Sequence, residues 1–232
     1  MADKIHVVLV HGAWADGSSW SGVIPRLLET GYDVTAGQIP LTSLGEDAGV
    51  VRRILALQKG PTVLVGHSYG GTVISEAAAD APHVTSLVYI SAFANDEGET
   101  LGELNARVAL PPGPSPLRFN DAGFVWIDPE AFPQVFAQDV DPTQARIMAA
   151  VQKPIAAKVF GEKAGKPAWK SIPSWYLMSE GDRMIAPETQ RFMANRMGAK
   201  TRTHHVDHSP MYTSPEVVVS VILEAARETL AC

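Results

Sequence analysis

The sequence has little of what a secreted or membrane protein needs. Its single cysteine, Cys232, cannot form a disulfide within the chain, so nothing indicates an oxidising compartment. No apolar run approaches the ~20 residues that a membrane-spanning helix requires. The apolar run Ile5–Val10 is too short for the core of a signal peptide. We therefore expect a cytoplasmic protein that does not associate with membranes.

Clustered positive charge and metal-binding motifs are also missing. The chain has 19 lysines and arginines against 25 aspartates and glutamates, a formal net charge of −6. Nucleic-acid binding needs clustered Lys and Arg, so we expect no nucleic-acid partner. Neither H-E-x-x-H nor C-x-x-C occurs, and the group from His204 to His208 lacks a recognised ligand spacing. We expect no metal and no cofactor.

The chain does have a globular composition, with 46% hydrophobic and 19% charged residues, and its strand and helix patterns alternate. Near-continuous apolar runs are typical of strands buried on both faces of a parallel sheet. The alternation predicts an α/β fold, with a mostly parallel sheet and helices on both faces. The predicted strands are Ile5–Val10, Asp33–Ala36, Thr62–Val65, Val84–Ile90, Ser174–Ser179 and Thr201–His205. The predicted helices are Trp20–Thr30, 43–60, Gly70–Asp80, Pro187–Met197 and one that opens at Ser214-Pro215-Glu216.

The alternation breaks between residues 95 and 171. Nine prolines and no strong strand signal predict loops with short helices, for example around Pro142–Val151. An insertion between two strands usually lies over the strand ends, where active sites are built. We therefore divide the chain into a core domain, residues 1–94 and 172–232, and a cap, residues 95–171.

The segment Gly66-His67-Ser68-Tyr69-Gly70 matches G-x-S-x-G and lies between a predicted strand and a predicted helix. A sharp turn there forces the serine into strained backbone angles, and the glycines remove Cβ atoms that would clash. The hydroxyl then projects above the sheet, next to a helix N-terminus that favours developing negative charge. The pattern predicts Ser68 as a nucleophile. A phosphate-binding glycine loop is excluded because its motifs do not occur.

A serine nucleophile also needs two backbone N–H groups that converge on the oxyanion of its tetrahedral intermediate. One comes from the residue after the nucleophile, here Tyr69, and the other from a neighbouring loop. The segment His11-Gly12-Ala13-Trp14 directly follows the first predicted strand, which makes Ala13 the expected second donor. His11 is expected to hold this loop through packing or local hydrogen bonds.

A serine is a weak nucleophile unless an adjacent base takes its proton. In enzymes with this turn the chain order is Ser, then Asp or Glu, then His, which leaves His204, His205 and His208 as candidates. His204 and His205 fall within the last predicted strand, whereas His208 lies in the loop after it. We favour His208, because a loop at a strand end is where a base is needed.

The acid that orients the base should follow another strand. The segment Glu180-Gly181-Asp182-Arg183 follows the strand Ser174–Ser179, and Asp182 is the expected partner of His208. Glu180 is the alternative, although it borders the end of the strand. Asp207 is adjacent to His208, and neighbouring side chains rarely face each other as this bond requires.

Aromatic side chains in the first loop and in the cap have two interpretations. They can be packing, or they can form an apolar pocket for the acyl or alcohol part of a substrate. On the second interpretation we expect Trp14, Trp126 and Met211 to contact the substrate. The other aromatic candidates are Phe124, Phe132 and Phe136.

Several segments of the chain together resemble a known group of proteins. They are the loop 11–14, the serine turn 66–71, the segment 91–100, Asp182 and His208-Ser209-Pro210-Met211. They resemble the plant methylesterase and hydroxynitrile lyase branch of the α/β-hydrolases, with its bacterial relatives. The resemblance covers residues 5 to 229 and is weakest in the cap. It implies the α/β-hydrolase fold, a serine–histidine–aspartate triad, no cofactor, and small esters as substrates.

Two departures from that branch bear on the reaction. The lyase members carry a threonine after the first histidine and a lysine after the catalytic histidine, where this chain has Gly12 and Ser209. Without the lysine, a leaving cyanide has no cation to meet it. We therefore predict a serine hydrolase that cleaves small carboxylic esters through an acyl-enzyme intermediate. The alternatives are a hydroxynitrile lyase-like or cofactor-free perhydrolase reaction on the same fold, and a non-catalytic small-molecule binding protein.

Overall fold

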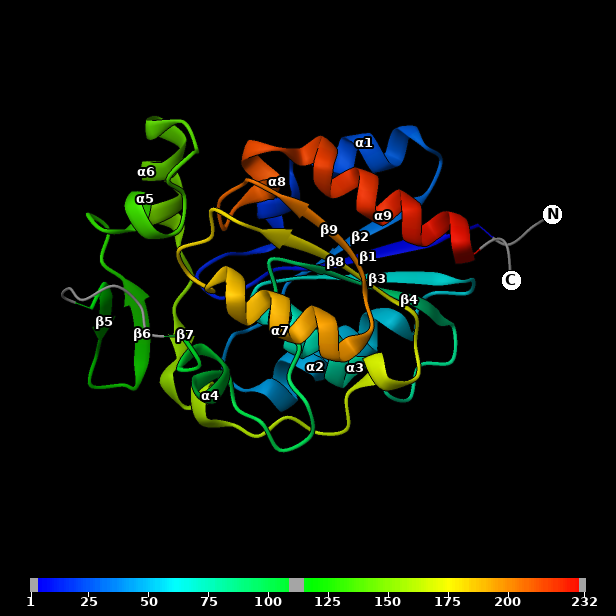
Figure 1. Ribbon diagram of the computed structural model, residues 1–232, viewed down its shortest axis with the longest axis horizontal. Helices are drawn as coiled ribbons and strands as arrows, with labels where there is room; N and C mark the ends of the chain where they lie inside the picture. Colours follow the sequence, from blue (N-terminus) through cyan, green and yellow to red (C-terminus); the bar gives the residue numbers. More distant parts are fainter. Residues whose placement is uncertain (1–3, 109–114, 230–232) are drawn as a thin grey trace.

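The computed structural model describes residues 4–108 and 115–229, and its centre is a six-stranded sheet (Figure 1). All neighbouring strands of this sheet pair in parallel, which confirms the predicted α/β class. The strand order is β2-β1-β3-β4-β8-β9. The strands are β1 (His6–Val10), β2 (Asp33–Gly37), β3 (Thr62–His67), β4 (Val84–Ile90), β8 (Ser174–Ser179) and β9 (Lys200–His204).

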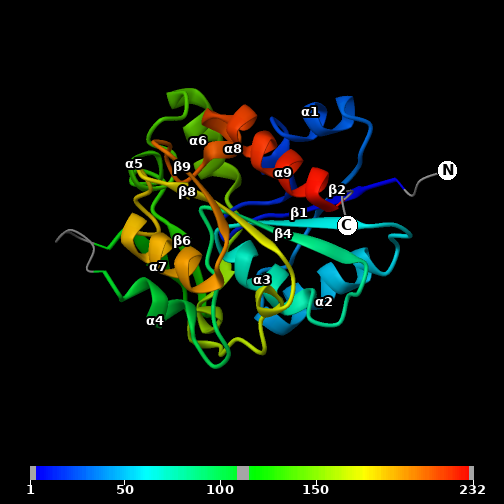
Figure 2. The same cartoon turned by 45° about the vertical axis from the view of Figure 1, so that its right-hand side comes forward.

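Helices cover both faces of the sheet (Figures 1 and 2). Alternate residues of β1 explain the two layers: Val8 and Val10 pack in one apolar cluster, and Val7 and Leu9 pack in another. Because both of their faces are covered, the inner strands β1, β3, β4 and β8 are mostly apolar, whereas the edge strands β2 and β9 are more polar and less buried. One face carries α2 (Leu44–Leu55), α3 (Tyr69–Ala77) and α7 (Pro187–Met197), and the other carries α1 (Ile24–Glu29) and α9 (Pro215–Thr229). Within the described ranges, no helix is both long and apolar enough to cross a membrane.

The segment between β4 and β8 lies beyond the carboxyl ends of the central strands (Figure 1). The helix predicted at Pro142–Val151 is present as α6. The prediction that this segment lacks strands is wrong, because β5, β6 and β7 form a three-stranded antiparallel sheet. These strands have only three, four and two residues, too few for a period to emerge. The elements are α4 (Leu101–Asn105), β5 (Leu117–Phe119), β6 (Phe124–Ile127), α5 (Phe132–Val135), α6 (Pro142–Val151), β7 (Ile155–Ala156), η2 (Ala157–Gly161) and η3 (Ala168–Lys170).

Two predicted helices have different bounds in the structure. The pattern over Trp20–Thr30 divides into a 3₁₀ helix, η1 (Gly17–Trp20), and the short helix α1. The proline of α1, Pro25, occupies the first turn, where its missing N–H has no partner to lose. The helix predicted over 43–60 ends at Leu55, and beyond Ala56 the N–H groups of Leu57 and Gln58 bond three residues back rather than four.

Candidate active site

Ser68 occupies the turn between β3 and α3, with a φ of +52° and a ψ of −124°. A positive φ strains any residue other than glycine, so the surrounding structure must hold it in place. The Ser68 N–H donates to the carbonyl of Ile90 at 3.2 Å, and the Ser68 carbonyl accepts from the N–H of Phe93 at 3.0 Å. The turn also needs its glycines: a Cβ on Gly66 would lie 2.5 Å from the carbonyl oxygen of Gly70. The local sequence therefore places Ser68 in the strained turn between strand and helix that the G-x-S-x-G pattern predicts.

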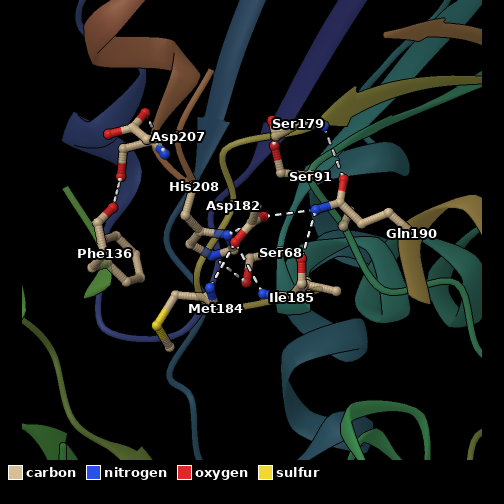
Figure 3. Close-up of polar contacts among 12 residues, drawn as sticks. Ser68, Ser91, Phe136, Ser179, Asp182, Met184, Ile185, Gln190, Asp207 and His208 are labelled. Atoms are coloured by element: carbon tan, nitrogen blue, oxygen red, sulfur yellow. Dashed lines mark hydrogen bonds and ion pairs between the residues drawn. The ribbon is translucent and has the colours of Figure 1, made fainter. Parts of the chain in front are cut away.

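His208 lies in the loop between β9 and the short helix α8 (Pro210–Thr213), and its ring connects the other two predicted residues (Figure 3). Its Nε2 is 3.0 Å from Ser68 Oγ, and its Nδ1 is 2.8 Å from Asp182 Oδ2. A carboxylate only accepts, so Nδ1 carries the proton and the Nε2 lone pair faces the serine hydroxyl. Positions separated by 140 and 26 residues thus form one hydrogen-bonded chain.

Asp182 follows β8 in a turn that fixes its carboxylate from both sides. Oδ1 accepts the N–H groups of Met184 at 2.7 Å and Ile185 at 2.9 Å. Oδ2 accepts from His208 and also from Nε2 of Gln190, at 2.8 Å. Gln190 was not predicted from the sequence. Its position in the first turn of α7, eight residues after the predicted acid, was the only available signal.

The alternative carboxylates do not contact His208. Glu180 is exposed, and its N–H pairs with β9. Asp207 is buried, and its Oδ1 accepts from Ser209 N and Thr213 Oγ1, each at 3.1 Å, so that the side chain points away from the neighbouring ring. Burial raises the pKa of Asp207 above its usual value. Of the three carboxylates considered, Asp182 alone bonds the His208 ring.

The loop after β1 passes directly beside Ser68, because β1 and β3 are paired neighbours. A Cβ on Gly12 would lie 2.7 Å from Ser68 Cβ, so the threonine of the lyase members does not fit this backbone. The backbone N–H groups of Ala13 and Tyr69 have no hydrogen-bond partner within the described part of the chain. Both residues are buried, and an oxyanion site requires backbone N–H groups that are free to donate.

His11, the first residue of this loop, is fully buried. Its Nε2 accepts the N–H of Ile39 at 3.2 Å, so the proton resides on Nδ1, which donates to the carbonyl of Gly12 at 2.8 Å. Burial disfavours the imidazolium and lowers the pKa of His11 to about 4. The ring therefore makes the local hydrogen bonds that the sequence predicts.

The buried neutral state of His11 predicts a pH dependence of stability. The pKa is about 4 in the folded chain against 6.5 for an ordinary histidine, so the unfolded chain binds the extra proton between these values. The stability that the folded chain gains from a neutral His11 is fully present above about pH 6.5 and is lost as the pH falls toward 4. As the pH is lowered from about 7 to about 5, we expect protonation of His11 in the unfolded chain to reduce the free energy of unfolding by roughly 2 kcal/mol. Urea denaturation of the wild type and His11→Gln should give a steeper pH dependence for the wild type, and parallel curves would refute this.

Two further contacts around the serine were not predicted. Nε2–H of His67 donates to the backbone carbonyl of His208 at 2.7 Å, and burial keeps the pKa of His67 well below its usual value. The hydroxyl of Tyr69 donates to Asp47 Oδ2 at 2.7 Å, and Asp47 Oδ1 accepts the N–H of Leu41 at 2.7 Å. These contacts tie the serine turn to the base loop and to α2. An aspartate on the buried face of α2 was the only sequence signal for the second.

The 134–139 segment, which includes the end of α5, bonds to the turn that carries Asp182. Nε2 of Gln138 donates to the carbonyl of Gly181 at 2.6 Å. In the other direction, Nη1 of Arg183 donates to the carbonyl of Gln134 at 2.9 Å. The residues on each side of Asp182 are therefore attached to this segment.

The same 134–139 segment also bonds to the loop that carries His208. The hydroxyl of Ser209 donates to the carbonyl of Phe136 at 2.7 Å, and the N–H of Asp139 donates to Asp207 Oδ2 at 3.3 Å. The Phe136 ring meets the His208 ring edge to face, with centroids 4.9 Å apart. Ser209, which replaces the lysine of the lyase members, is thus buried and occupied by this contact.

Two of the three predicted substrate-contacting residues line the same pocket. Trp14 and Met211 both border a mostly apolar pocket whose lining includes His67 and Ser209, the chain neighbours of Ser68 and His208, but not Ser68 or His208 themselves. Trp126 does not border it: on β6 it is half-buried and alternates with the buried residues Val125 and Ile127. Phe132, Phe136 and Met148 complete the apolar wall.

Comparisons with known proteins place this chain in a family. Residues 7–221 match the model of the alpha/beta hydrolase family. An alpha/beta hydrolase of Aspergillus novofumigatus is 28% identical over 98% of both chains. Methylesterase 8 of Arabidopsis thaliana is 24% identical over 96% of this chain and 90% of the relative. The crystal structure of a pyrethroid hydrolase from Sphingobium faniae superposes with a TM-score of 0.81, at 24% identity over 97% of this chain and 98% of the other.

The predicted resemblance to the methylesterase branch is confirmed by these relatives, and the family model covers most of the chain. The fold, the matched segment and the relatives agree: this chain belongs to the alpha/beta hydrolase family.

Proposed function

We propose that this chain is a carboxylic ester hydrolase that cleaves small esters through an acyl-enzyme on Ser68. The observation that carries the proposal is the unbroken chain of hydrogen bonds from Ser68 Oγ through His208 to Asp182. A neutral imidazole whose Nε2 lone pair faces a serine hydroxyl can take its proton as that oxygen attacks a carbonyl. The relatives, which include methylesterases and a carbendazim-hydrolysing esterase, support ester hydrolysis.

In the proposed mechanism, Ser68 Oγ attacks the ester carbonyl while His208 Nε2 takes the hydroxyl proton. The resulting oxyanion accepts hydrogen bonds from the N–H groups of Ala13 and Tyr69, and Asp182 stabilises the imidazolium. Collapse of this intermediate breaks the bond to the alcohol, which leaves with the proton from His208. Water then repeats the sequence on the acyl-enzyme, releasing the acid and restoring Ser68.

A fluorophosphonate probe tests whether Ser68 is activated. We expect the probe to add covalently to the folded chain, with the modification mapped to Ser68 by peptide mass spectrometry, because only a serine with an adjacent base attacks phosphorus readily. The same preparation should hydrolyse p-nitrophenyl acetate. Esters of graded size would then report which acyl and alcohol parts the pocket accepts.

Other outcomes would favour the alternatives. A folded chain that neither reacts with the probe nor hydrolyses any ester of the panel would contradict the proposal and favour a binding protein. Turnover of a cyanohydrin without ester hydrolysis would favour a lyase. The occupied Ser209 hydroxyl and the close approach of Gly12 to Ser68 argue against that outcome. A cytoplasmic location remains a prediction from the sequence alone.

A further inference from the structure

Gln190 is a fully buried side chain that uses every hydrogen-bonding atom it has (Figure 3). Its Oε1 accepts the N–H of Ser179 at 3.0 Å. Its Nε2 donates to Asp182 Oδ2 at 2.8 Å and to the carbonyl of Ile185 at 2.9 Å. A backbone N–H can only donate, so the atom facing Ser179 must be the oxygen, and the nitrogen must face Asp182. The amide therefore has one possible orientation.

This amide bonds to the same carboxylate oxygen that holds the His208 ring. Asp182 Oδ2 accepts from both Gln190 and His208, and Oδ1 accepts from the two backbone N–H groups of Met184 and Ile185. A carboxylate offers about four lone-pair positions, so all of them are occupied. Without Gln190, Oδ2 would keep His208 as its only partner, and the carboxylate would lose one of the contacts that oppose its rotation, the one on the oxygen that bonds His208.

We infer that Gln190 is a positioning residue, whose amide holds the Asp182 carboxylate in the orientation that directs Nε2 of His208 toward Ser68. This inference rests on the proposed ester hydrolysis for its kinetic test. The residue spans the end of β8 at Ser179, the turn at Ile185 and the carboxylate itself, so it joins the strand and helix that flank the turn. A neutral amide supplies the two donors and one acceptor that these partners need, without adding a charge beside the aspartate.

Gln190→Met tests the role, because methionine has a similar length and no amide. We expect kcat for p-nitrophenyl acetate to fall about 10- to 100-fold, the factor for losing a hydrogen bond to a charged group. KM should change little, because the amide lies behind Asp182 and acts through His208. The matched control is Thr189→Val on the adjacent position of α7. The Thr189 hydroxyl is buried and has no partner in the described chain, so its removal should leave kcat unchanged.

Gln190→Glu separates a positioning role from general packing. A protonated glutamic acid can still donate to Asp182 Oδ2, whereas an ionised one repels it. The activity of Gln190→Glu relative to the wild type should therefore fall as the pH rises. A packing role predicts a ratio that does not depend on pH, and such a ratio, or equal kcat values for Gln190→Met and Thr189→Val, would overturn the inference.

A second measurement does not depend on ester turnover. The proton between His208 Nδ1 and Asp182 should give a downfield ¹H NMR signal, which we expect to broaden or shift in Gln190→Met and to persist in Thr189→Val. An unchanged signal in Gln190→Met would also overturn the inference. If the wild type hydrolyses no ester, but the signal changes in Gln190→Met and persists in Thr189→Val, the proposed function fails and the positioning role stands.

Discussion

Ser68→Ala is expected to lower kcat/KM for p-nitrophenyl acetate about 10⁴-fold or more, because it removes the atom that forms the acyl-enzyme. His208→Ala should have a comparable effect, since a serine without a base is a weak nucleophile. Ser68 and His208 are joined at 3.0 Å and should act as one unit. The double variant should therefore be hardly slower than either single variant. Initial rates over a range of substrate concentrations measure each effect.

Ser75→Ala is the matched control for Ser68→Ala. Ser75 is a buried serine on α3, and its hydroxyl contacts Tyr89 and the carbonyl of Gly71 rather than any predicted site residue. Its removal should leave kcat/KM close to that of the wild type. Equal activity of Ser68→Ala and the wild type would end the proposed mechanism, as would double-variant losses that multiply.

The second large effect is on stability, at Gly71. A Cβ on this residue would lie 2.2 Å from the carbonyl oxygen of Phe93 and 2.8 Å from Ala92 Cβ. The backbone at Phe93 cannot easily withdraw, because its N–H donates to the carbonyl of Ser68. We expect Gly71→Ala to reduce the free energy of unfolding by roughly 3 kcal/mol or more, through forced backbone displacement. Urea denaturation followed by circular dichroism measures this change.

Gly45→Ala provides the control for a glycine within a helix. Gly45 is exposed in the first turn of α2, and a Cβ there would meet no atom within 4 Å. Alanine should be neutral or stabilising by up to about 1 kcal/mol, because it reduces the freedom of the unfolded chain. Equal stabilities of Gly71→Ala and Gly45→Ala would contradict the prediction, because the backbone around Gly71 would then accommodate a Cβ without a cost in free energy.

The sequence predicts the central sheet well because of how that sheet is buried. β4, β8 and α7 have the predicted bounds, because strands covered on both faces are mostly apolar, and proline and glycine mark the limits of α7. The chain order of serine, acid and base, together with the positions of the strand ends, predicted Asp182 rather than Glu180 as the acid. The same two signals predicted His208 rather than His204 or His205 as the base, and the structure joins the two predicted side chains.

The remaining features depend on tertiary contacts that leave no local pattern. The sheet formed by β5, β6 and β7 has strands too short for a period, and Trp126 does not line the pocket bordered by Trp14 and Met211. Gln190 and Asp47 look like ordinary helix residues until the fold turns them toward Asp182 and Tyr69. Such partners become predictable only when the neighbouring elements are known.

The attachment of the 134–139 segment to both loops has a practical consequence for altering specificity. Exchanging all of residues 95–171 for the equivalent block of a relative would import new walls for the pocket and would also discard the bonds to Gly181, Asp207 and Ser209. We expect a graft that retains these six native positions, and replaces only the chain on either side, to change the walls of the pocket while it keeps the bonds to the loops of Asp182 and His208.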